Sequence, residues 1–137
     1  MGTYYGVHRT LEKARTMLDP GEWGARVKCS YDSYEASAIT AGSTISMCFV
    51  PKGARIIRGE VWFDDLGSTG GTLKVGDGTD DDEYMTSTAV GVAAGSATFN
   101  VLDNLGEPLD ADEYMIVTTG TKTMTGTIKM FVWYVQD

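Results

Sequence analysis

The sequence has little of the chemistry on which most enzymes depend. Its 137 residues include one histidine, His8, and two cysteines, Cys29 and Cys48. It contains no His-Glu-x-x-His zinc motif, no phosphate-binding glycine loop and no Gly-x-Ser-x-Gly elbow. Because a nucleophile needs a base beside it, we predict that the chain has no catalytic residues, requires no cofactor and is not an enzyme.

Long apolar runs are also missing. The longest, residues 130–135, is far shorter than the roughly 20 residues that cross a bilayer, and residues 1–15 lack the apolar segment of a secretory leader. The two cysteines do not form a Cys-x-x-Cys pair, and each lies in an alternating, strand-like pattern. We therefore expect no membrane partner, two reduced and packed thiols, and synthesis in a cytosol.

Positive charge is scarce and unevenly placed. The net charge of −8 divides into +2 over residues 1–28 and −10 over the remainder. An acidic surface repels the phosphates of nucleic acids, which are bound by clustered lysine and arginine. The sequence therefore argues against nucleic acid as a partner, and it indicates a mildly basic arm before an acidic body.

The first residues predict a short helical arm. Apolar side chains recur at the spacing of one helix face, and an Asp-Pro-Gly sequence then ends the pattern. A helix this short is marginal in water, so it must pack on a partner. We predict that residues 1–22 form a docking arm and that residues 23–137 form the body. The side chains expected to dock are Val7, Arg9, Leu11, Arg15 and Leu18.

In the body the period of the apolar pattern changes to two, which is typical of β-strands. The segments with this pattern are residues 27–31, 45–49, 57–63, 73–75, 97–101, 114–118 and 125–135. Glycine-rich turns separate them, and no helical pattern lies between them. Seven or eight short strands of this kind predict an all-β fold, namely an antiparallel β-sandwich or barrel.

The last segment is apolar on both faces, with Ile128 and Met130 on one face and Phe131 and Trp133 on the other. Such a strand must be covered on both sides, by the core on one and by a loop or another subunit on the other. Trp62 raises the same question, because it shares an otherwise polar face with arginine, a frequent pairing at interfaces. The residues predicted for a subunit interface are Trp62, Arg58, Phe131 and Trp133.

Acidic residues gather in the Gly-Asp-Gly-Thr-Asp-Asp-Asp-Glu-Tyr-Met stretch of residues 76–85. Oxygen ligands in a turn suit Ca²⁺, and the candidate ligands are Asp77, Asp80 and Asp82, but the spacing departs from that of an EF-hand loop. A solvated turn is the favoured interpretation, with no metal bound. The letters Asp-Glu-Tyr-Met recur at residues 112–115, and in both copies we expect the tyrosine and methionine to begin the buried part.

Several segments together resemble a known family. They are Glu-Trp-Gly-Ala-Arg-Val-Lys at 22–28, Tyr-Asp-Ser-Tyr at 31–34, Pro-Lys-Gly-Ala-Arg-Ile-Ile at 51–57, Leu-Lys-Val-Gly-Asp-Gly-Thr-Asp at 73–80 and Thr-Gly-Thr-Ile at 125–128. In these segments the chain resembles the small decoration, or cement, proteins of tailed bacteriophages and cyanophages. The resemblance covers most of the chain from about residue 20.

The resemblance implies a jelly-roll-like β-sandwich that is made in the host cytoplasm and ends on the outer surface of the virion. It implies a homotrimer bound to the major capsid protein, stabilising the shell, with an arm reaching onto it. It carries over no catalytic residue. The alternative is a carbohydrate-binding sandwich of a phage tail or fibre, because exposed aromatic and acidic side chains also suit sugars.

Overall fold

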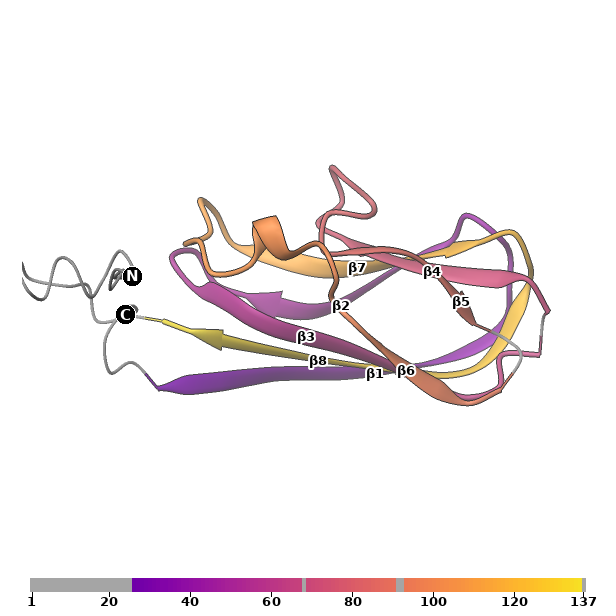
Figure 1. The fold of residues 1–137 in the computed structure, drawn as a ribbon. Helices are drawn as coiled ribbons and strands as arrows, with labels where there is room; N and C mark the ends of the chain where they lie inside the picture. The colour runs from indigo at the N-terminus through magenta and orange to yellow at the C-terminus, as the bar shows by residue number, and fades with distance from the viewer. Residues whose placement is uncertain (1–25, 68, 91–92, 137) are drawn as a thin grey trace, which may run out of the picture.

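A computed structural model describes residues 26–136 except 68 and 91–92. In this part of the chain eight antiparallel strands form two stacked sheets, and a short 3-10 helix, η1, lies in the loop after the sixth strand (Figure 1). The elements are β1 (Val27–Ile39), β2 (Thr44–Val50), β3 (Arg55–Phe63), β4 (Gly71–Gly76), β5 (Met85–Val90), β6 (Gly95–Thr98), η1 (Leu102–Asn104), β7 (Glu113–Gly120) and β8 (Met124–Val135). The predicted all-β sandwich is confirmed.

The connection of the strands is that of a jelly roll. The first sheet has the order β1-β8-β3-β6 and the second sheet the order β2-β7-β4-β5. β1 therefore pairs with β8, β2 with β7, β3 with β6 and β4 with β5, as if one long hairpin had been wrapped into two sheets. Eight strands in two four-stranded sheets with this pairing make a jelly roll, as the resemblance implied.

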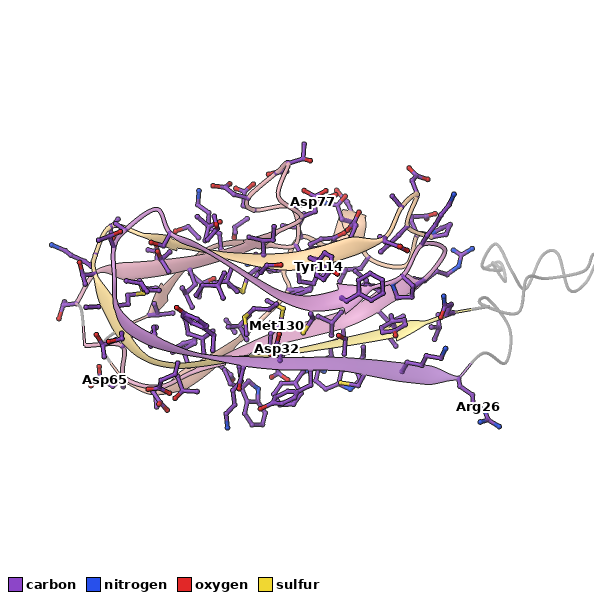
Figure 2. All side chains as sticks on the ribbon, turned by 180° about the vertical axis from the view of Figure 1, so that it is seen from behind. Arg26, Asp32, Asp65, Asp77, Tyr114 and Met130 are labelled. Atoms are coloured by element: carbon purple, nitrogen blue, oxygen red, sulfur yellow. The ribbon has the colours of Figure 1, made fainter. Side chains whose placement is uncertain are left out.

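The core lies between the sheets and is built by alternate residues of each strand. Ile128, Met130 and Val132 of β8 are fully buried there, as are Met115 and Val117 of β7. Tightly packed branched and sulfur-containing side chains exclude water from this layer, and their burial supplies most of the stabilising free energy. Figure 2 shows Met130 in this layer between the two sheets.

The two cysteines have different surroundings. Cys48 is buried, and its Sγ lies 3.4 Å from the carbonyl oxygen of Ser30 and 3.5 Å from that of Met130. Burial raises the pKa of this thiol to about 11, so it stays protonated at neutral pH. Cys29 is free and exposed on β1. The prediction of a packed thiol is therefore confirmed for Cys48 and wrong for Cys29.

Candidate functional site: two exposed aromatic surfaces

The outer side of the first sheet carries a cluster of four aromatic rings, two of them exposed and two half-buried. We call it the aromatic face, and it consists of Tyr31 of β1, Trp62 of β3, and Phe131 and Trp133 of β8. Tyr31 pairs directly with Phe131 across the two strands. The ring centroid of Phe131 lies 4.9 Å from that of Tyr31, 4.9 Å from that of Trp62 and 5.9 Å from that of Trp133. The rings therefore form one continuous apolar surface.

This arrangement follows from the double-faced sequence of β8. Because Met130 and Val132 point into the core, Phe131 and Trp133 must point outward. β8 is a central strand of its sheet, so its neighbours β1 and β3 place further side chains beside the two rings. Trp62 remains 46% exposed and Tyr31 53% exposed. Within residues 26–136, as far as the structure describes them, no loop covers these two rings.

Charged groups border the aromatic face at one end. The Cζ atom of Arg58 lies 5.9 Å from the ring centroid of Trp133, a cation–π distance, and its guanidinium lies 3.9 Å from the carboxylate of Glu60. These residues, with Val27 and Ile57, line a shallow groove of about 410 Å³. The structure thus brings together Trp62, Arg58, Phe131 and Trp133, the four residues predicted for a subunit interface. Their contact with another subunit stays a prediction.

Tyr31, Val27 and Ile57 belong to the same surface, although the alternating pattern alone suggests that they face the core. β3 has a register irregularity between Ile56 and Arg58, which leaves Ile56 buried and turns Ile57 out to solvent. On β1, Val27 and Tyr31 face outward because they alternate with the side that carries the buried Ala36. Two consecutive isoleucines within an alternating strand were the available signal of a bulge.

A smaller aromatic surface lies on the outer side of the second sheet. We call it the aromatic pair: Phe49 of β2 and Tyr114 of β7, which stand directly opposite each other with ring centroids 5.2 Å apart. Phe49 is 41% exposed and Tyr114 54% exposed. A bulge between Ser46 and Phe49 buries both Met47 and Cys48, which reverses the alternation and turns Phe49 outward. The expectation that Tyr114 begins the buried part is wrong, whereas its counterpart Tyr84 is buried.

The acidic loop between β4 and β5 folds back onto the same outer side of the second sheet. Gly76 permits this approach, because a Cβ atom there would lie 1.8 Å from the backbone oxygen of Asp80. Gly78 has φ +95° and packs against the side chain of Ile116, which shares a face of β7 with Tyr114. Figure 2 shows Asp77 in the loop that projects from the second sheet, the sheet to which Tyr114 belongs. The acidic loop therefore borders the aromatic pair.

Within this loop the acids mostly hold the backbone. Oδ1 of Asp77 accepts hydrogen bonds from the N–H groups of Thr79 at 2.9 Å and Asp80 at 3.0 Å. Partial burial raises the pKa of Asp77, but the hydrogen bonds from Asp80 and Thr79 outweigh it and hold the pKa below its usual value. The acids whose oxygens lie within 4.8 Å of one another are Asp80, Asp81 and Asp82. The predicted solvated turn with no metal stays a prediction, and of the three weak Ca²⁺ candidates, Asp77, Asp80 and Asp82, the first is already engaged by backbone hydrogen bonds.

A second group of acids ties the loop to the sandwich. The hydroxyl of Tyr84 donates a hydrogen bond of 2.5 Å to Oε2 of Glu113. Burial and this hydrogen bond raise the pKa of Tyr84 above its usual value. Burial also raises the pKa of Glu83 to about 7, with the hydrogen bond to Asp77 and the negative charges of Asp77 and Glu113 adding to the shift. Glu83 therefore takes up a proton at a higher pH than an ordinary glutamate does.

The predicted arm lies outside the described residues, and so do its docking side chains. They are Val7, Arg9, Leu11, Arg15 and Leu18. The first described residue, Arg26, directly precedes Val27, which lines the groove at the end of the aromatic face. No helix among the described residues is long and apolar enough to span a membrane.

Comparison with known proteins gives matches of structure but not of sequence. No protein-family model and no curated protein matches this chain. A chain of the cyanophage Pam1 capsid asymmetric unit superposes with a TM-score of 0.73 at 23% identity, over 88% of this chain and 93% of that one. A chain of the capsid of Ralstonia phage GP4 superposes with a TM-score of 0.67 at 22% identity, over 82% of this chain and 85% of that one.

A third match is to a chain in the acid-stable capsid structure of the Helicobacter pylori bacteriophage KHP30. It has a TM-score of 0.61 at 7% identity, over 80% of this chain and 86% of that one. At such identities the likeness concerns the fold, and in each case it extends over most of both chains. This protein is therefore similar in fold to chains that occur in the capsid structures of three phages.

Proposed function

We propose that the protein is a structural component of a phage virion, which binds the outer surface of the capsid as a homotrimer and stabilises the shell. Two observations support this proposal. The jelly roll is similar to chains in three phage capsid structures. The aromatic face presents tyrosine, tryptophan and arginine side chains. These three residue types are enriched among the interface residues that contribute most of the binding free energy.

The aromatic face is the observation that carries the proposal. Two exposed and two half-buried aromatic rings side by side leave a continuous apolar patch in water, which costs free energy in a monomer and favours association. Packing the faces of three copies around a common axis would remove these rings from water. Arg58 and Glu60 at the border would then set the orientation of the subunits rather than supply most of the affinity.

Residues 1–22 would act as a docking arm and residues 23–137 as the body. The described part of the body begins at Arg26, next to the groove that ends the aromatic face, and the arm would precede it by a few residues. Three arms would therefore start close together in a trimer. Each arm would add apolar contacts through Val7, Leu11 and Leu18, and linkage within one trimer would multiply weak contacts through effective concentration.

The stabilising effect follows from mass action. A protein that binds only the assembled shell lowers the free energy of that state by its own binding free energy. It would be made in the host cytoplasm and would end on the outside of the virion, with the major capsid protein as its partner. The site needs no cofactor for this role.

The direct test is to mix the purified protein with undecorated heads assembled from the capsid protein of the same virus. Co-sedimentation with the heads and a trimeric mass at sedimentation equilibrium are the expected results. Deleting residues 1–19 should leave a folded body that no longer sediments with heads. A full-length chain that stays in the supernatant would contradict the proposal.

Binding of a carbohydrate is the second candidate function, and one cavity favours it. A pocket of about 380 Å³ beside Trp62 is lined by polar side chains that include Asp64, Ser96, Thr127 and Lys129. An aromatic ring next to hydrogen-bonding groups suits a sugar, whose apolar face stacks on the ring. A glycan array would decide, because a trimeric capsid protein without this function should bind none of the sugars.

A further inference from the structure

We propose that the aromatic pair of Phe49 and Tyr114 is a second docking surface, and that it binds a protein surface with an apolar depression rimmed by lysine and arginine. The inference rests on the proposed function, since it assigns this surface to the capsid shell and the aromatic face to contacts between copies. It thereby names the side of the sandwich that faces the shell.

The first argument is the exposure of two large rings at one spot. Phe49 and Tyr114 lie directly opposite each other on neighbouring strands, so their side chains form one patch that the backbone holds rigidly. Phe49 points outward only because β2 has a bulge, since regular alternation would bury its side chain. Rigid, exposed aromatic rings lose little conformational entropy on binding and make effective anchors.

The second argument is geometric. The two aromatic surfaces lie on the outer sides of two stacked sheets and therefore face in opposite directions. A trimer closed by three-fold rotation joins two different patches of neighbouring copies. If those patches faced in opposite directions, repeating the contact would add copies along a line and produce an open filament. The aromatic pair is therefore not the counterpart of the aromatic face in a closed trimer.

The third argument is charge. The acidic loop borders the aromatic pair on one side, where the carboxylates of Asp80, Asp81 and Asp82 cluster. Lys74 lies 3.3 Å from the carboxylate of Asp81 and offsets one of these negative charges, so the loop remains acidic. On the other side Oδ1 of Asp112 accepts a hydrogen bond from the backbone N–H of Lys52 at 2.7 Å. Two copies of such an acid-bordered surface repel each other, whereas a basic rim attracts it. The partner is therefore a different protein surface, and a basic one.

The test uses the full-length protein and undecorated heads. The variant combines Phe49→Ser with Tyr114→Ser, and its matched control combines Phe49→Tyr with Tyr114→Phe, which keeps both rings. We expect the serine variant to bind heads more than about tenfold more weakly than wild type, with an unchanged sedimentation coefficient and circular dichroism spectrum. The control should bind as wild type does.

A second variant tests the charge and does not touch the core. Replacing Asp80, Asp81 and Asp82 by asparagine should slow association with heads several-fold at low salt and reduce the dependence of the association rate on NaCl. These side chains lie in an exposed or half-exposed loop, so folding should be retained. An association rate that is unchanged at every salt concentration would contradict the basic rim.

The outcomes separate this inference from the proposed function. If wild type fails to bind heads, the proposed function falls and this inference falls with it. If wild type and the serine variant bind heads equally well, only the inference is overturned. A serine variant that dissociates to monomers would assign the aromatic pair to contacts between copies. A peptide of residues 1–25 that binds wild type but not the serine variant would also overturn the inference. It would show that the arm of a neighbouring copy, and not the shell, binds the aromatic pair.

Discussion

The hydroxyl of Tyr84 donates its hydrogen bond to the carboxylate of Glu113, and this contact joins the two copies of the Asp-Glu-Tyr-Met sequence. Tyr84 belongs to the first copy and is buried, whereas Glu113 belongs to the second and begins β7. The tyrosine of the second copy, Tyr114, points outward. The same four letters thus supply a buried anchor in one place and an exposed contact residue in the other.

Changing Tyr84 to phenylalanine should lower the free energy of unfolding by about 2 kcal/mol, because a hydrogen bond to a charged carboxylate is lost within a mostly buried site. The measurement is urea unfolding followed by fluorescence. Tyr114→Phe is the matched control in the second copy, and its effect should stay within about 0.5 kcal/mol, since its ring is exposed. Equal effects of the two changes would contradict the assigned roles.

Glu83 should make the protein less stable as the pH rises from about 4.5 to about 7. Its pKa is about 7 in the folded protein and 4.5 in its unperturbed state, so the folded state binds the extra proton in this window. Stability therefore falls with rising pH, because the native state takes up more protons than the unfolded one. Allowing for partial solvent exposure, the loss should be about 1 to 2 kcal/mol.

The check is the difference between wild type and Glu83→Gln, measured by urea unfolding at about pH 5 and about pH 8. Glutamine keeps a donor toward Asp77 but does not titrate, so the variant should lose this part of the pH dependence. Parallel curves for the two proteins would mean that Glu83 has an ordinary pKa.

Replacing Ala38 by glycine should stabilise the protein. Its φ is +51°, in the left-handed region that alanine adopts at a cost, and its N–H donates to Oγ1 of Thr125 at 2.9 Å. Ala38→Gly should raise the free energy of unfolding by about 0.5 to 1 kcal/mol. Ala36→Gly is the opposite control, because Ala36 is buried in regular strand and its loss should destabilise. The measurement is thermal unfolding of both variants, and a melting temperature of Ala38→Gly below that of wild type would contradict the prediction.

Ca²⁺ should leave the melting temperature unchanged within about 1 °C when it replaces a chelator. The reason is that Oδ1 of Asp77 already accepts two backbone hydrogen bonds, so binding an ion through this residue would compete with the turn itself. A rise of several degrees would show instead that the neighbouring aspartates hold an ion. Mg²⁺ at the same concentration controls for simple screening of charge.

The sequence was sufficient to predict the sandwich and the double-faced β8, because period-two alternation reports directly on which side of a strand a residue lies. It did not predict β5, whose Thr-Ser-Thr centre lacks apolar alternation, although Met85 and Val90 at its ends are buried. The jelly-roll order of the strands was predicted only from the resemblance to decoration proteins. The local alternation of apolar residues does not indicate which distant strands pair.

The candidate site was only partly predictable for a related reason. Trp62, Phe131 and Trp133 follow the regular alternation, and the structure brings them together as expected on one face. Phe49 and Ile57 do not, because Phe49 follows the bulge in β2 and Ile57 is the extra residue of the irregularity in β3, so each points to the side opposite to the one that the alternation predicts. Both bulges coincide with two adjacent apolar residues in an alternating strand, which is a usable signal for such reversals.

The pairing of β1 with β8 has a mechanical consequence. Arg26, the first described residue, directly precedes β1, and β1 remains paired with β8 from Val27 opposite Val135 to Ile39 opposite Met124. A force that pulls Arg26 along the strand axis would load these hydrogen bonds together, in shear, instead of opening them one after another. If the arm is tethered to a shell under internal pressure, this geometry lets the body resist the pull without unravelling from its first strand.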